Sequence, residues 1–232
     1  MKKHAALLLG IIATVIPVAA RSAAPLMPSA NSHNWAGYEA SGTGFSAISG
    51  SWNVSSPGAT STTAGDATWV GIGGMQSADL IQVGTRALIA DGAVSYEAWY
   101  ELLPRAAVPV PLSISAGDTI DATVLQTAPD EWRITLLDAS TGKQFVTTLS
   151  YHSSESSAEW VEEAGGDGTK LTPLDQFSPV TFTNASAAQA GQTRSLAALK
   201  ATRLTLVTTS LEALATASPV STGGASFVVS RD

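Results

Sequence analysis

The sequence predicts an all-β protein, built as a sandwich of two antiparallel sheets. Three observations support this fold class. Short runs rich in Val, Ile, Thr, Trp and Tyr recur along the chain, apolar and polar residues alternate within them, and Gly, Pro, Asp and Ser separate them. Helical periodicity is scarce by comparison. Ten or more such strands are most simply buried by packing two sheets face to face.

The predicted strands follow one another in chain order. Asp138 to Lys143 predicts a hairpin loop, and Ser195 to Lys200 is the clearest helical stretch, with a second candidate near Glu159. Ser55 to Ala67 is rich in Gly, Ser, Thr and Pro and predicts a loop within one domain. The runs are ATWVGI (67–72), LIQVGTRALIA (80–90), VSYEAWYELL (94–103), PLSISA (111–116), DTIDATVLQT (118–127), EWRITLLDA (131–139), KQFVTTLSY (143–151), PVTFTNA (179–185), LTLVTT (204–209) and SFVVS (226–230).

Residues 1–24 have the pattern of a secretory signal peptide. Lys2 and Lys3 form a charged start, an apolar run follows, and small residues allow cleavage after Ala20 or after Ala24. A membrane anchor is the alternative, but the apolar run is short for a span. We therefore expect residues 25–232 to form a single β-sandwich domain that is secreted, extracellular or periplasmic, and free of the membrane after cleavage.

Charge and composition exclude several classes of function. The formal net charge is −7, and it becomes −9 without Lys2 and Lys3 and −10 without Arg21 as well. Such a surface repels nucleic acid. Cysteine is absent, and no His, Asp and Glu cluster has metal-ligand spacing. We expect no metal, no cofactor, no nucleic-acid partner and a monomer.

The few histidines restrict the chemistry further. His4 leaves with the signal peptide, and His33 and His152 lie in polar stretches that predict surface positions. A Ser-His-Asp site is therefore disfavoured. If the exported protein is an enzyme, its acid–base chemistry rests on carboxylates, assisted by neutral amides.

Strand alternation sorts the candidate carboxylates by face. In VSYEAWYELL, Glu97, Trp99 and Glu101 share a face, and in ATWVGIGG Trp69 shares one with Gly71 and Gly73. These residues could belong to an active site, or they could be ordinary solvent-facing carboxylates and core tryptophans without a catalytic role. Periodicity alone does not separate these two interpretations.

SSAEWVEEA, residues 156–164, permits two local structures. As a strand it places Glu159 and Glu163 on one face, roughly 13 Å apart, with Glu162 facing the other way. As a helix it begins at a capping box, Ser156-x-x-Glu159, and brings Glu159 close to Glu163. The local pattern leaves both structures open.

Several motifs in one order resemble the glutamic peptidases, the eqolisin or peptidase G1 family. These motifs are SHNWAGY, TWVGIGG, LIQVGT, YEAWYELLP, ISAGDTI and AEWVEE. The resemblance runs from about Asn31 to Ala185 and fits a secreted, bacterial-type member. It implies a concanavalin-like sandwich of two long antiparallel sheets. It also implies a pepstatin-insensitive acid endopeptidase that acts on polypeptides.

The resemblance also implies roles for particular residues. Gln82 and Glu159 match the catalytic pair, Glu159 as the general base and acid that activates water and Gln82 as the oxyanion stabiliser. Trp69 and Glu101 match residues that line the site. We expect hydrogen-bond donors around Glu159 to keep its pKa low enough for partial ionisation in acid. Further candidates for lining the site are Trp99 and Gly73.

Some features depart from the family pattern. The family often has Asp where this chain has Gly73, the segment between Trp69 and Gln82 is one residue shorter, and the family's disulfides are missing. SHNWAGY, which resembles a mature start, follows the signal almost at once. We therefore expect little or no propeptide.

Two other functions remain possible from the sequence. A secreted glycoside hydrolase could use Glu97 and Glu101, although four strand positions separate them by roughly 13 Å, too far for either standard carboxylate spacing. A non-catalytic carbohydrate-binding β-sandwich could present Trp69, Trp99 and Tyr100 as a stacking surface.

Overall fold

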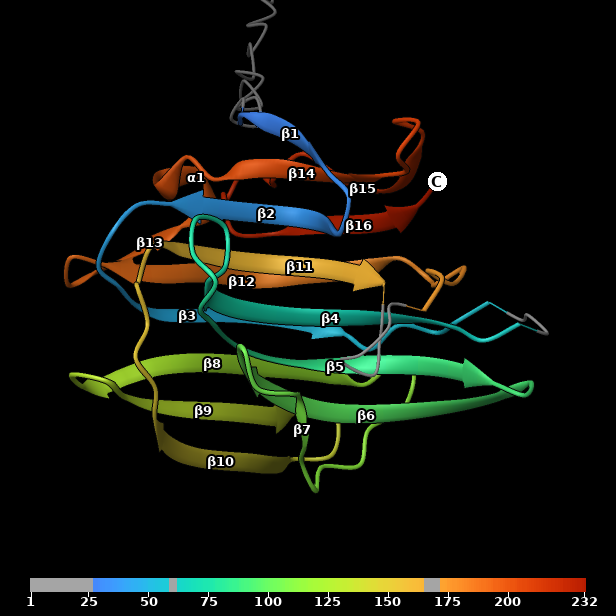
Figure 1. The fold of residues 1–232 in the computed structure, drawn as a ribbon, viewed down its shortest axis with the longest axis horizontal. Helices are drawn as coiled ribbons and strands as arrows, with labels where there is room; N and C mark the ends of the chain where they lie inside the picture. The colour runs from blue at the N-terminus through green and yellow to red at the C-terminus, as the bar shows by residue number, and fades with distance from the viewer. Residues whose placement is uncertain (1–26, 59–61, 165–171) are drawn as a thin grey trace, which may run out of the picture.

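The chain folds almost entirely into β-strands. The computed structural model describes residues 27–58, 62–164 and 172–232, and the predicted signal peptide with both cleavage positions lies outside them. Within these ranges one helix, α1 Leu196–Leu199, accompanies the strands (Figure 1). The strands are β1 Ser29–Ser32, β2 Trp35–Ser41, β3 Phe45–Asn53, β4 Ala64–Gly73, β5 Leu80–Ala90, β6 Ala93–Leu102, β7 Val108–Pro109, β8 Thr119–Ala128, β9 Glu131–Asp138, β10 Lys143–Ser150, β11 Ser157–Ala164, β12 Val180–Gln189, β13 Gln192–Ser195, β14 Thr202–Val207, β15 Ala213–Ala217 and β16 Phe227–Arg231.

The strands form two packed layers, as Figure 1 shows. One layer has the order β10-β9-β8-β3-β12 and the other β2-β11-β4-β5-β6-β7, and β16-β15-β14 connect them along one edge. Contacts of β3 with β4, of β5 with β8 and of β11 with β12 join the layers face to face. Every pairing along this path is antiparallel. The predicted antiparallel sandwich is confirmed.

Large aromatic side chains fill the space between the layers. Trp52, Trp132, Trp160 and Phe182 are fully buried there. The indole of Trp160 donates a hydrogen bond across the sandwich to the Ser49 carbonyl at 2.8 Å. Because buried indole N–H groups need a partner, this bond fixes the inward direction of Trp160. The residues before and after it on β11 therefore face the opposite side of the sheet.

Three carboxyl groups also face this interior, at the opposite end from the predicted site. Glu162 accepts a hydrogen bond from the Thr68 hydroxyl at 2.6 Å, and Asp66 accepts one from Ser55. Burial raises the pKa of Asp66, and it raises the pKa of Glu162 well above its ordinary value. Burial and the nearby Asp66 carboxylate raise the pKa of Asp175 to about 7. These groups are therefore protonated in acid.

Several local expectations can be checked against the strands and turns. The helix expected at Ser195 to Lys200 is present as α1, and the Ser195 hydroxyl caps it by accepting from the Ala198 N–H. The hairpin loop at 138–143 is present, and the Asp138 carboxylate accepts hydrogen bonds from the backbone N–H groups of residues 140 and 141. Both features follow from short polar side chains that bond to nearby backbone.

Of the two local structures left open for residues 156–164, the strand is the one present. Glu159 lies on strand β11, because apolar neighbours on both faces bury the segment between two strands. Two other expectations were wrong. The run at 111–116 is not a strand, since Pro109 and Pro111 each lack the N–H that would continue the sheet edge. The loop predicted at 55–67 ends earlier, because β4 already begins at Ala64.

Candidate active site

Three of the predicted site residues, Gln82, Glu101 and Glu159, lie in one row across the sheet. In the registers of β2, β11, β4, β5 and β6, Glu39 lies opposite Glu159, Glu159 opposite Gly71, Gly71 opposite Gln82, and Gln82 opposite Glu101. Residues directly opposite one another in a sheet point to the same face. The side chains of this row therefore share the outer face of the layer, away from Trp160.

Gly71 leaves the space between Gln82 and Glu159 open. Their Cα atoms are two strand spacings apart, about 10 Å, so both side chains reach over the residue between them. A Cβ atom at position 71 would stand 3.0 Å from the Cβ of Gln82 and 2.9 Å from a Leu80 methyl group. The glycine therefore makes room for a small polar group, held between an amide and a carboxyl.

The amide of Gln82 is buried and held in place by Glu101. Gln82 is 4% exposed, and its Nε2 donates to the Glu101 carboxylate at 2.5 Å. Its Oε1 has no hydrogen-bond partner among the described residues. An amide nitrogen carries two N–H donors, so one remains for a ligand. Burial raises the pKa of Glu101, partly offset by the hydrogen bond from Gln82.

Glu159 is fully buried, and its proton is held tightly. Burial raises the pKa of Glu159 well above its ordinary value; the nearby Ser157 hydroxyl lowers it, while the charges of Glu39 and Asp79 raise it further. Neither carboxyl oxygen accepts a hydrogen bond from the described part of the chain. The expected ring of donors around Glu159 is therefore wrong, since its neighbours in the row are glycine and another carboxylate.

An apolar cluster lies beside this row on the same face. Trp69 is fully buried, Trp99 is 4% exposed, and both pack with Val161. The ring of Trp35 meets Trp69 edge to face, with centroids 5.2 Å apart. Apolar walls exclude water and strengthen electrostatic interactions within a site. Trp69 and Trp99 therefore lie beside the row, on the same face of the sheet.

Gly73 is held in a conformation that only glycine adopts readily. Its φ is +93°, and a Cβ there would stand 2.5 Å from the Asp79 carbonyl oxygen and 3.0 Å from an Asp79 carboxylate oxygen. The Asp79 carboxylate accepts from the Ser154 N–H at 2.7 Å. Such bonds outweigh burial and lower the pKa of Asp79. A charged carboxylate from the β4–β5 loop therefore stands where a side chain at position 73 would begin.

The other candidate residues are engaged elsewhere. Glu97 forms an ion pair with Arg86 at 2.7 Å, four residue pairs along the sheet from Glu101. Tyr100 points to the interior, where its ring stacks on Phe145. With Trp69 and Trp99 buried as well, the described residues contain neither the carboxylate pair of a glycoside hydrolase at Glu97 and Glu101 nor the exposed aromatic surface of a carbohydrate-binding module.

Strand alternation correctly predicts the faces of Glu162 and Glu163, and the polar surroundings of His33 and His152 correctly predict surface positions. Glu162 faces the interior, as expected, and Glu163 lies on the outer face, where it accepts from the Asn34 amide at 3.2 Å. His33 is exposed, and the His152 side chain is 89% exposed and pairs with Asp130 at the surface. The described histidines therefore take no part in the row.

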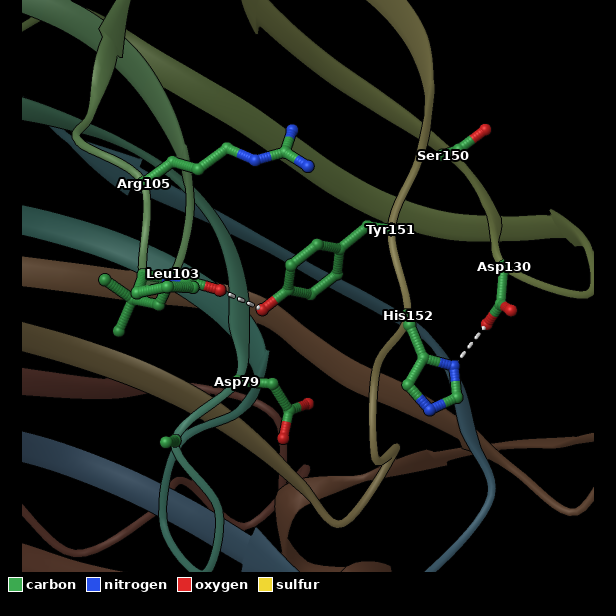
Figure 2. Close-up of a pocket in the computed structure, with 9 residues that line it drawn as sticks. Asp79, Leu103, Arg105, Asp130, Ser150, Tyr151 and His152 are labelled. Carbon is green, nitrogen blue, oxygen red and sulfur yellow. Dashed lines mark hydrogen bonds and ion pairs between the residues drawn. The ribbon is translucent and has the colours of Figure 1, made fainter.

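A cavity of about 580 Å³ adjoins the ends of β5 and β6. Figure 2 shows Tyr151 reaching from the β10–β11 connection to Leu103, with Arg105 and Asp79 on opposite sides of its ring. The Tyr151 hydroxyl donates to the Leu103 carbonyl at 2.8 Å and accepts from the Leu80 N–H at 2.8 Å. Tyr151 thus ties together the segments next to Gln82 and Glu101.

Comparison with known proteins agrees with this geometry. A family model, described as the Peptidase A4 family, matches residues 33–231, which include every residue of the row. The chain belongs to the Peptidase A4 family. This membership confirms the resemblance to the eqolisins.

Named Peptidase A4 relatives resemble the chain in sequence and in fold. Aspergillopepsin-2 of Aspergillus niger is 32% identical over 187 residues, and scytalidopepsin B of Scytalidium lignicola is 34% identical over 177 residues. Each match covers 70% of this chain and 66% of the relative, so the chain spans slightly less than two thirds of their length. A crystal structure of scytalido-glutamic peptidase with a transition state analog inhibitor superposes with a TM-score of 0.75 at 28% identity, covering 86% of this chain and 98% of that one.

Within residues 27–58, 62–164 and 172–232, no His, Cys, Asp and Glu group is arranged to hold a metal ion. Over the same ranges no helix is long and apolar enough to cross a membrane.

Sequence reasoning missed two residues of the row. Glu39 lies in WAGYEAS, whose alternation of small and large residues is a strand signal, and Gly71 was noted only as a neighbour of Trp69. Their place beside Glu159 depends on strand registers, which one segment alone does not specify.

Proposed function

We propose that the protein is a secreted acid endopeptidase that hydrolyses peptide bonds in polypeptides with Gln82 and Glu159. The observation that carries this proposal is the row in which both residues flank Gly71 on one face of the sheet. Membership of the Peptidase A4 family supports peptide bonds as the substrate. A structural relative, scytalido-glutamic peptidase, has been solved with a transition state analog inhibitor, which supports peptidase chemistry on this fold.

Glu159 and Gln82 have different roles in the proposed reaction. Ionised Glu159 accepts a proton from water, which attacks the carbonyl carbon of the scissile bond. The free N–H of Gln82 donates to the developing oxyanion, while Glu101 holds the other N–H. Glu159 then gives its proton to the leaving amine, and the C–N bond breaks. An amide does not titrate in this range, so Gln82 keeps its role in acid.

The raised pKa of Glu159 has two opposite effects on these tasks. Once ionised, a carboxylate with a high proton affinity is a stronger base toward water, and it holds the proton until the amine is ready to leave. In acid only a fraction of the molecules carries ionised Glu159, so the rate should rise with pH as that fraction grows. Trp69 and Trp99 would exclude bulk water from the exchange.

The test is acid proteolysis by the purified protein. Denatured protein is incubated across acidic pH with and without pepstatin, using wild type, Glu159→Gln and Gln82→Ala. We expect pepstatin-resistant cleavage by wild type, and losses of about 10²- to 10⁴-fold in each variant. Circular dichroism and thermal unfolding confirm that each variant is folded. Undiminished cleavage by either folded variant would exclude this assignment, and release of reducing sugar from polysaccharide without proteolysis would favour a glycoside hydrolase.

Export and oligomeric state belong to the same proposal. The signal-like residues 1–24 support secretion of a monomer that comprises residues 25–232. N-terminal sequencing of the exported protein should give Arg21 or Pro25 as the first residue. Sedimentation of that protein should give the mass of one chain, whereas retention of Lys2 and Lys3 would contradict cleavage.

A further inference from the structure

Glu39 is a buried carboxyl that the proposed reaction does not use. It lies on β2 directly opposite Glu159 on β11, and it is 7% exposed while Glu159 is fully buried. Opposite residues on adjacent strands have Cβ atoms about 5 Å apart. The two carboxyl groups therefore stand side by side on the face that carries Gln82.

The surroundings of Glu39 provide little to neutralise it. The Ser41 hydroxyl donates to its Oε2 at 2.9 Å, and its neighbour on β14 is the uncharged Thr202. On the strands β2, β11, β4, β5 and β6, the cation of this face is Arg86. It is paired with Glu97 and lies four residues along β5 from Gln82. The other charged groups of this face and its ends are Glu101 and Glu163 on the strands, and Asp79 and Arg105 in the loops.

Two neighbouring carboxyl groups in one buried place resist ionising together. The charge on one makes the proton on the other harder to remove. The charge of Glu39 is among the causes that raise the pKa of Glu159, after burial. Removing that charge would therefore let Glu159 ionise at lower pH and weaken it as a base.

We infer that Glu39 is a positioning residue that acts electrostatically through Glu159 and sets the acid range in which Gln82 and Glu159 work. This inference rests on the proposed function, because it assigns Glu39 to the same site. Glu39 touches no reacting atom; its charge stabilises the proton that Glu159 takes from water. The pH at which the site becomes active thus depends on a pair of carboxyl groups and not on Glu159 alone.

The experiment compares pH profiles of kcat/KM for wild type, Glu39→Gln, Glu39→Asp and Glu212→Gln. Glu39→Gln keeps the size of the side chain and removes its charge, so the acid limb should move about one pH unit lower. Glu39→Asp keeps a carboxylate and should retain a limb close to that of wild type. Glu212→Gln removes a charge from an exposed turn and should leave the limb in place. An unmoved limb in active Glu39→Gln overturns the inference, as does an equal shift in Glu212→Gln.

Carbon-13 NMR of the glutamate carboxyl groups provides a readout that does not need activity. The Glu159 signal is identified as the one missing from Glu159→Gln. This signal should change to its ionised position at lower pH in Glu39→Gln than in wild type, and Glu39→Ala replaces Glu39→Gln if that variant does not fold. An unmoved Glu159 signal in the folded variant overturns the inference. A shifted Glu159 signal in a protein without proteolytic activity would instead count against the proposed function alone.

Discussion

The interior carboxyl groups predict that the protein is most stable in acid and loses stability toward neutral pH. Asp66, Glu162 and Asp175 are buried between the layers, and burial is the largest cause that raises the pKa of each. A carboxyl with a raised folded-state pKa binds more protons in the folded than in the unfolded chain. Its stabilising effect is complete below its unfolded-state pKa, near 4, and is lost as pH rises through the folded-state value.

Asp175 gives the size of the effect. Its pKa rises from an ordinary 3.8 to about 7, and the residue is 3% exposed. A difference of about three pH units corresponds to about 4 kcal/mol, since each unit contributes about 1.4 kcal/mol. Typical domains unfold with about 5–15 kcal/mol, so this group alone could remove a large share of the stability between pH 4 and pH 8. Glu162 and Asp66 act in the same direction.

Urea unfolding followed by tryptophan fluorescence at unit steps from pH 4 to pH 8 measures this dependence. The unfolding free energy of wild type should fall by several kcal/mol over that range. Glu162→Gln removes one buried titrating group whose pKa is raised well above its ordinary value, so its slope should be shallower. Glu212→Gln, in an exposed turn, should keep the wild-type slope. A stability that is flat or rises toward pH 8 would refute the reasoning.

Two further predictions concern the geometry of the site. Gly71→Ala places a methyl group 3.0 Å from the Cβ of Gln82. Steady-state kinetics should show kcat falling at least tenfold, on the order of the loss from a misplaced catalytic group, with a smaller change in KM. An unchanged kcat would show that the row tolerates the methyl group. Tyr151→Phe leaves the Leu80 N–H and the Leu103 carbonyl without their hydrogen-bond partner. Chemical denaturation should show the free energy of unfolding falling by about 1–3 kcal/mol. A fall smaller than the error of the method would contradict the bridging role of Tyr151.

The antiparallel sandwich was predictable because most of its strands have a local sequence pattern, the alternation of apolar and polar residues. Alternation identified most strands and the faces of Trp69, Glu101 and Glu162, since side-chain direction follows from strand geometry alone. The run at 111–116 was wrongly predicted to be a strand. It begins with Pro111 at the sheet edge, where the missing N–H ends the pairing.

The candidate site was less accessible to sequence reasoning, because it is assembled across strands. The local pattern at residues 156–164 left a strand and a helix open, and tertiary pairing of β11 with β2 and β4 decided the structure. Local patterns gave no reason to join Gln82 with Glu159; the family resemblance did so, and the registers through Gly71 supply the geometry. Glu39 escaped notice, because its position is defined only by its partner on β11.

The central claim is that Gln82 and Glu159 act as one unit on the substrate. It is tested most directly by kcat/KM for acid peptide hydrolysis by wild type, Gln82→Ala, Glu159→Gln and the double variant, all shown to be folded. Residues that act as a unit have non-additive effects, so the double variant should lose no more than about the larger of the two single losses. Losses that multiply in the double variant, or wild-type activity in either single variant, would contradict the claim.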